Sequence, residues 1–109
     1  KPGKPCFRYS AEGGGLSESG AIAYGELKLL ALDVGQTAKV VVEPARGFDA
    51  GAGPGRRIER EVRGGTVGLI LDGRGRPLVL STDRAAARVD MERWVDALGL
   101  YRQPEPAGV

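Results

Sequence analysis

The sequence contains no histidine and a single cysteine, Cys6, among its 109 residues. A disulfide within the chain is therefore impossible, and a zinc site made of cysteine and histidine is excluded because such sites use about four of these ligands. A serine or cysteine nucleophile activated by histidine is excluded for the same reason. Carboxylates are present at Asp49, Glu61 and Asp72, but no spacing forces two of them together. We expect a protein that is not an enzyme and that holds no cofactor or metal.

The sequence also lacks a long apolar run and an excess of one charge. No run approaches the ~18 apolar residues that a membrane-spanning helix requires. The 16 basic and 14 acidic residues are interspersed and leave a net charge of +2, so no broad field attracts nucleic acid or anionic lipid. We therefore expect no nucleic-acid partner and no membrane partner. The single cysteine favours a cytoplasmic or otherwise reducing compartment.

The strongest strand pattern lies in residues 64–80. Val67, Leu69, Ile70 and Leu71 form an apolar run without polar interruption, which is typical of a strand that is buried on both faces. Turn residues follow at positions 72–77, and residues 78–80 are apolar again. This pattern predicts a hairpin whose first strand is the central strand of the fold.

Shorter runs with a period of two predict further strands on either side of this hairpin. We expect a short edge strand over residues 6–10, a loop over residues 11–20, and a strand over residues 20–29 with a bulge or strand end by residue 32. A turn is expected at residues 33–36, with Gly35 at positive φ. A strand over residues 37–43, with Ala38, Val40 and Val42 facing inward, and an edge strand over residues 57–63 complete the prediction. Together these runs predict a mainly β fold, either a small sandwich or a partly open barrel.

The period changes after residue 81, which predicts one C-terminal helix over about residues 82–98. Ser81 or Thr82 is expected to cap it, and Gly99 to end it. Its apolar stripe consists of Ala87, Met91, Trp94, Val95 and Leu98, at helical spacing. We predict a flexible N-terminal segment over residues 1–20, a single β-rich domain over residues 21–101 and a disordered tail over residues 102–109.

Two glycine- and arginine-rich segments are candidate binding sites. Residues 47–55 contain four glycines and are followed by Arg56 and Arg57, so backbone N–H groups and two guanidinium groups could hold a small anion or phosphate. The segment does not match a P-loop, which needs a lysine and a serine or threonine before a helix. A mobile loop or a protein contact is the favoured alternative. Asp49 belongs to the same candidate site.

The second segment, residues 74–77, reads Arg-Gly-Arg-Pro and resembles the core of an AT-hook. Asp72 precedes it and apolar strands flank it, whereas a hook is a flexible basic segment. A turn in which Arg74 and Arg76 contact a partner or stabilise the sheet edge is therefore favoured over DNA binding. Exposed turns carry function more often than core strands do, which makes Asp49, Arg56, Arg57, Arg74 and Arg76 the predicted binding residues.

A longer stretch of the chain resembles a known family. The resemblance spans about Val34 to Tyr101 and rests on the run FDAGAGPGRRIEREVRGGTVGLILDGRGRPLVL and on the later ERWVDALGLY, and the preceding GELKLLALDVGQTAKVVVEP is also similar. These motifs are similar to the C-terminal part of long members of the glutamate mutase L (MutL) family, which are actin-like ATPases associated with adenosylcobalamin-dependent mutases. The phosphate and adenosine motifs of the ATPase core are missing here.

The resemblance implies an accessory domain of a larger protein, and it supplies no catalytic residue at any position of this chain. The implied partner is a mutase subunit or the ATPase domain of the same chain. We therefore expect a non-catalytic interaction domain. The alternative is a small-anion or phosphate-binding module that uses the glycine-rich loop 47–57.

Overall fold

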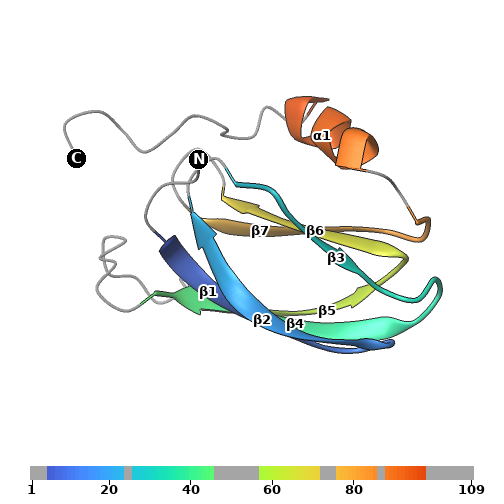
Figure 1. Ribbon diagram of the computed structural model, residues 1–109, viewed down its shortest axis with the longest axis horizontal. Coiled ribbons are helices and arrows are strands. Elements are labelled where there is room, and N and C mark those ends of the chain that lie inside the picture. Colours follow the sequence, from blue (N-terminus) through green and yellow to red (C-terminus); the bar gives the residue numbers. More distant parts are fainter. Residues whose placement is uncertain (1–4, 24–25, 46–56, 72–75, 86–87, 98–109) are drawn as a thin grey trace.

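A computed structural model describes residues 5–23, 26–45, 57–71, 76–85 and 88–97. Within them, seven strands form two antiparallel sheets that pack face to face, and one helix covers the outer face of the smaller sheet (Figure 1). The elements are β1 (Pro5–Gly13), β2 (Leu16–Ala23), β3 (Lys28–Ala31), β4 (Thr37–Pro44), β5 (Ile58–Arg63), β6 (Thr66–Leu71), β7 (Pro77–Thr82) and α1 (Arg88–Ala97). One sheet has the order β2-β1-β4-β5 and the other has the order β3-β6-β7. The predicted mainly β fold with one C-terminal helix is confirmed, and it is an open sandwich.

Strand β6 is the central strand of the smaller sheet, as its sequence predicts. All six of its residues are buried, and β3 and β7 pair with it on its two sides. Val67, Leu69 and Leu71 point into the sandwich core. Ile70 points to the other face, where α1 covers it. The uninterrupted apolar run thus reflects burial on both faces, because one face meets a sheet and the other meets a helix.

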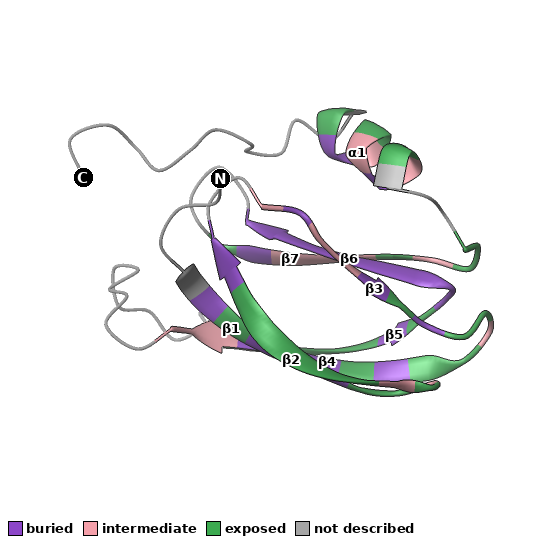
Figure 2. Ribbon diagram, viewed as in Figure 1, coloured by how far each residue is buried: buried purple, intermediate pink, exposed green. Residues whose placement is uncertain are grey.

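The sandwich core is made of alternate residues from both sheets (Figure 2). In β4, Ala38, Val40 and Val42 are buried while the residues between them are more exposed, which confirms the predicted alternation. Strand β5 is the edge strand that the sequence predicts. The core residues are Phe7, Tyr9, Ala11, Ile22, Leu30, Leu32, Ala38, Val40, Val42, Val62, Val67, Leu69 and Leu71.

The N-terminal predictions are wrong in two respects. The expected loop over residues 11–20 is the end of β1, a short turn and most of β2. Strand β1 is an inner strand between β2 and β4, and not an edge strand. The sequence does not predict β2 because five of its residues are exposed, and two of these five are Gly20 and Ala21. At Gly20 the ring of Tyr9 fills the space where a Cβ would lie. The aromatic ring of the neighbouring strand therefore covers the backbone of Gly20, which has no side chain of its own.

Residues 20–32 form two strands in different sheets, where the sequence predicts one. Strand β2 ends at Ala23 in the larger sheet, and β3 begins at Lys28 in the smaller one. Leu30 contributes to the sandwich core, while Leu29 packs under the helix. The change of phase that the sequence shows near Leu30 arises from this burial on both faces and not from a bulge. The other predicted alternative, a strand end by residue 32, is confirmed, because β3 ends at Ala31.

The helix begins later than predicted. Its described residues are Arg88–Ala97, whereas Ser81 and Thr82 belong to β7. The Oγ1 atom of Thr82 accepts a hydrogen bond from the Arg84 backbone N–H at 3.3 Å, so the hydroxyl closes a local turn and does not cap a helix. Met91, Val95 and the partly buried Trp94 pack on the smaller sheet, which confirms that part of the stripe. Ala87, Leu98, Gly99 and the predicted tail lie outside the described residues.

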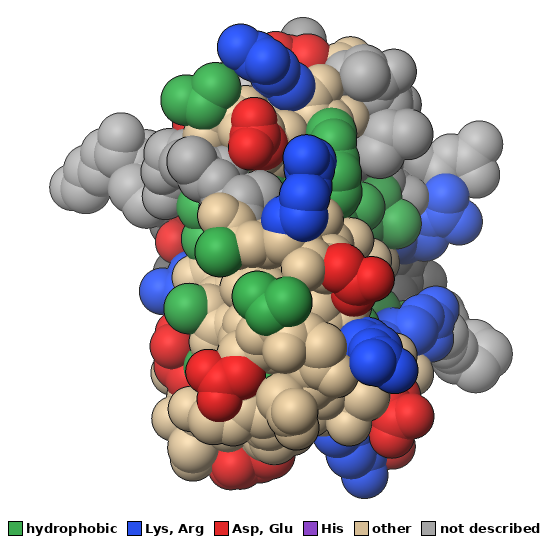
Figure 3. Space-filling view, turned by 90° about the vertical axis from the view of Figure 1, so that its right-hand side faces the viewer, with side chains coloured by type: hydrophobic (Ala, Val, Ile, Leu, Met, Phe, Trp, Pro, Cys, Tyr) green, Lys and Arg blue, Asp and Glu red, His purple; other side chains and the backbone are tan. Residues whose placement is uncertain are grey.

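One end of the sandwich is built from turns that are hydrogen-bonded to one another. Gly14 O accepts from Asp33 N at 3.1 Å, Gly64 N donates to Gln36 O at 3.3 Å, and Gly65 N donates to Thr82 O at 2.6 Å. The described glycines with positive φ, namely Gly13, Gly14, Gly15, Gly35 and Gly64, all lie in or directly beside these turns. The position of Gly35 is as predicted. Figure 3 shows this end of the molecule, where backbone and uncharged polar side chains cover much of the surface.

Candidate functional site

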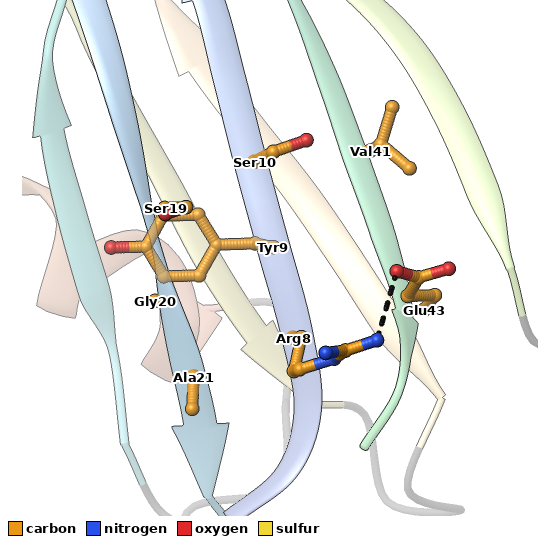
Figure 4. A pocket seen from close by; sticks show the side chains of 8 residues that line it. All are labelled: Arg8, Tyr9, Ser10, Ser19, Gly20, Ala21, Val41 and Glu43. Carbon is orange, nitrogen blue, oxygen red and sulfur yellow. Dashed lines mark hydrogen bonds and ion pairs between the residues drawn. The ribbon is translucent and has the colours of Figure 1, made fainter. Parts of the chain in front are cut away.

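A shallow cleft of about 500 Å³ opens on the outer face of the four-stranded sheet (Figure 4). Successive side chains of a strand point to opposite faces of the sheet. In β1, Phe7 and Tyr9 point into the core, so Arg8 and Ser10 are exposed on the outer face, where the cleft lies. The lining residues come from β1, β2 and β4. They are Arg8, Tyr9, Ser10, Ser19, Gly20, Ala21, Val41 and Glu43.

Strand register arranges the outward side chains of the cleft in two rows. Arg8 pairs with Ala21 on one side and with Glu43 on the other, which makes the first row. Ser10 pairs with Ser19 and Val41, which makes the second row. The floor is low above β2 and β1 because alanine and serine have short side chains.

An ion pair forms one wall of the cleft. Arg8 Nη2 lies 3.4 Å from Glu43 Oε2, and Figure 4 shows the arginine side chain extended from β1 towards β4. Because the guanidinium group reaches away from β2, the surface above Ser19 and Ala21 stays uncovered. The ion pair therefore helps to keep the cleft open on its β2 side.

This ion pair is the first link of a longer series of charges. Glu43 Oε1 lies 3.9 Å from Arg57 Nε, and Arg57 Nη1 lies 3.1 Å from Glu59 Oε1. Glu59 Oε2 lies 3.2 Å from Lys39 Nζ. Hydrogen bonds from Lys39 and Arg57 lower the pKa of Glu59. Three cations and two anions thus alternate across β1, β4 and β5, with a cation at each end.

Tyr9 supports the cleft from the core side. Its hydroxyl donates a 2.7 Å hydrogen bond to Glu18 Oε2, and Lys28 Nζ lies 5.9 Å from the ring centroid. Burial, reinforced by this hydrogen bond, raises the pKa of Tyr9 well above its ordinary value. The ring packs against Gly20, so it holds the edge strand β2 in place under the cleft.

Replacing Tyr9 by phenylalanine keeps the ring and removes the hydroxyl. We expect the free energy of unfolding to fall by about 1 kcal/mol, because one hydrogen bond to a partly exposed carboxylate is lost. Above pH 10.0, the ordinary pKa of tyrosine, the unfolded chain releases a proton that the folded chain keeps, so this contribution is lost as the pH rises. Urea unfolding at about pH 8 and about pH 11 should show the advantage of the native protein over Y9F shrinking by roughly 1 kcal/mol. An advantage that is equal at both pH values would contradict the assignment.

The structure describes two of the five predicted binding residues. Arg57 precedes β5 and Arg76 precedes β7, and these neighbouring edge strands start at the same end of the sandwich (Figure 1). Both are exposed, but neither lines the cleft. Asp49, Arg56 and Arg74 lie outside the described residues, as does most of the glycine-rich loop. The charge of Arg57 is already balanced by Glu43 and Glu59.

The sequence does not predict the cleft, because Ser19 falls within the expected loop over residues 11–20 and Ala21 lies just after it. One signal was present in the predicted strand over residues 37–43. Val41 is an apolar residue at an outward position of that strand, and it lines the cleft. An outward-facing apolar residue that is only partly buried, beside short side chains, is the pattern that could have indicated a contact surface.

The polar groups of the cleft are serine hydroxyls and one arginine–glutamate ion pair, which can form hydrogen bonds and ion pairs with a ligand. Its serine hydroxyls have no histidine to activate them, since the chain contains none, and its carboxylate is paired with arginine. Across the described ranges, no three potential ligands gather to hold a metal ion. In the same ranges no helix has the length and apolarity needed to span a membrane. Comparison with family models, curated proteins and solved structures found no match to this chain.

Proposed function

We propose that this chain is a non-catalytic interaction domain of a larger protein and that it binds a protein partner through the outer face of its four-stranded sheet. The observation that carries the proposal is the cleft above Ser10, Ser19 and Ala21. Its floor is low, its wall is an ion pair, and side chains of both charges surround it. Such a surface can receive a projecting side chain of a partner and align the surrounding charges with it.

The resemblance to the C-terminal part of long MutL proteins supports a choice of partner. In that family the ATPase acts beside adenosylcobalamin-dependent mutases. The partner is then either such a mutase or the ATPase domain of the same chain, and the compartment is the cytoplasm. The domain would contribute binding specificity to a reactivating or chaperone-like ATPase.

The alternative function, binding of a small anion by the loop 47–57, receives less support from the described residues. Arg57 is the described residue of that site, and its guanidinium group contacts two carboxylates. An anion at this position would have to compete with both of them. We therefore place recognition in the cleft.

A substitution that fills the cleft tests the proposal. Ser19→Arg places a long side chain on the floor, whereas Ser17→Arg places the same side chain on the same face of β2 but outside the cleft. Calorimetric titration of the domain with a purified mutase and with the ATPase domain should show binding to one of them. We expect S19R to weaken it about tenfold or more, which is ~1.4 kcal/mol or more, and S17R to leave it nearly unchanged. No binding to either protein, or equal losses in both variants, would reject the proposal.

A further inference from the structure

The floor of the cleft carries two hydroxyl groups that face solvent. Ser10 and Ser19 are directly opposite each other in the register of β1 and β2, and both are exposed on the outer face. Among the described residues neither side chain has a hydrogen-bond partner. Each hydroxyl can donate one hydrogen bond, so the two together offer two donors to a group that enters the cleft.

Arg8 adds charge-bearing donors at the rim. It is one of the two terminal cations of the series Arg8, Glu43, Arg57, Glu59, Lys39. Glu43 is shared, because its Oε2 faces Arg8 and its Oε1 faces Arg57. If Arg8 turned away, Glu43 would still have Arg57, and Glu59 would still have Lys39. The series therefore has one cation in excess, and of its two terminal cations Arg8 is the one that lines the cleft.

We propose that the cleft recognises the carboxylate of an aspartate or glutamate side chain on the protein partner. Arg8 pairs with this carboxylate, and the hydroxyls of Ser10 and Ser19 donate hydrogen bonds to it. The incoming charge completes the series, because six charges then form three pairs. This inference rests on the proposed function, since it names the side chain by which the partner is bound.

The surroundings favour an acidic group over a basic one. A lysine or arginine entering the cleft would face the guanidinium group of Arg8 and would compete with Arg8 and Arg57 for one carboxylate. Glu12, two residues beyond Ser10 on β1, accepts a 3.4 Å hydrogen bond from Ser17 and lies on the other side of the second row. Its charge disfavours an anion there, so the carboxylate is placed at the Arg8 end.

The size of the cleft favours a side chain on a larger partner over a free small anion. A cleft of about 500 Å³ lies in the range of ~300–1,000 Å³ that is typical of ligands much larger than acetate. It is open to solvent, so a single carboxylate would leave most of it filled with water. A peptide chain can place its acidic side chain against Arg8 while its backbone covers Val41 and Ala21.

The test compares two blocked pentapeptides, acetyl-Gly-Gly-Glu-Gly-Gly-amide and its glutamine counterpart, with sodium acetate as a third ligand. Binding to the domain is followed by the backbone amide resonances of Ser10, Ser19 and Ala21. We expect the glutamate peptide to bind about fivefold tighter than the glutamine peptide, the upper range for one exposed ion pair. Acetate is expected to bind more weakly than the glutamate peptide.

A matched pair of variants locates the interaction. Arg8→Gln should abolish the preference for glutamate, while Arg63→Gln, which removes the same charge from an exposed position of β5 on the same sheet, should retain it. Equal binding of both peptides, or equal effects of R8Q and R63Q, would overturn the inference. Acetate binding as tightly as the glutamate peptide would also overturn it, in favour of a free small carboxylate.

The outcome is independent of the test of the proposed function. If S19R abolishes binding of the mutase or the ATPase domain but the glutamate peptide shows no preference, the interaction domain stands and the carboxylate assignment falls. If the peptide binds as expected but neither protein does, the choice of partner falls and the recognition chemistry stands.

Discussion

Replacing Gly64 by alanine is expected to lower the free energy of unfolding by about 4 kcal/mol, which would leave little of the stability of a small domain. Gly64 has a φ of 147°, a backbone conformation that residues with a side chain rarely adopt. A Cβ atom at this position would also overlap the carbonyl oxygen of Thr82. The residue is buried, and its N–H donates to Gln36 O at 3.3 Å. The strain lies in the backbone of Gly64 and the overlap is with the backbone of Thr82. Neither segment can move far to relieve the added Cβ atom, so we expect the full cost to appear in the free energy of unfolding.

Gly35→Ala is the matched control for this prediction. Gly35 also has a positive φ, of 80°, but the nearest atom to its added Cβ is Arg63 Nη2 at 4.0 Å. Only the strain remains there, and we expect a loss of about 1 kcal/mol. Urea unfolding of both variants gives the comparison. A loss for G64A no larger than that for G35A would show that the contact with Thr82 is not a close one.

Shortening the two neighbouring core side chains of β6 should have large but different effects. Leu69 is fully buried in the sandwich core, and Ile70 is 1% exposed on the side that α1 covers. Leu69→Ala and Ile70→Ala should each lower the free energy of unfolding by roughly 2–5 kcal/mol, because each leaves a cavity. The larger of the two clusters contains Leu69, so we expect L69A to cost more.

Trp94 distinguishes the two variants. It is the only tryptophan of the chain, and it packs in the same cluster as Ile70. In the folded state, the fluorescence of Trp94 should shift to longer wavelength in I70A, because the helix packs less closely, and should stay unchanged in L69A. A shift in L69A of the same size would contradict the separation of the core into two layers.

The elements that could be predicted from the sequence are those whose pattern is strong and local. The run Val67–Leu71 marks a central strand because no polar residue interrupts it, and residues 37–43 mark a strand because they alternate. Gly35 lies in a turn where few other residues are accommodated at positive φ. The helix stripe of Met91, Trp94 and Val95 is recognisable because its spacing is helical.

The elements that could not be predicted are those whose environment comes from distant segments. Strand β2 has little hydrophobic pattern of its own, and it exists as a strand because β1 pairs with it and Tyr9 covers Gly20. Residues 20–32 read as one strand because the sequence does not show that the chain passes from one sheet to the other. The sequence predicts too early a helix start because a serine or threonine can cap a helix or close a turn, and only the pairing of β7 with β6 decides between them.

The candidate site depends on tertiary structure even more than the fold does. Arg8 and Ser10 of β1, Ser19 of β2 and Glu43 of β4 carry no common motif, and they meet because the register of three strands sets them in two adjacent rows. The arginines that the sequence singled out follow a local signal, the abundance of glycine and arginine in turns. By itself the sequence determined which segments could be buried, since burial requires apolar side chains at a regular period. Tertiary structure alone decided which short polar side chains share a surface, because that depends on which strands become neighbours and in which register.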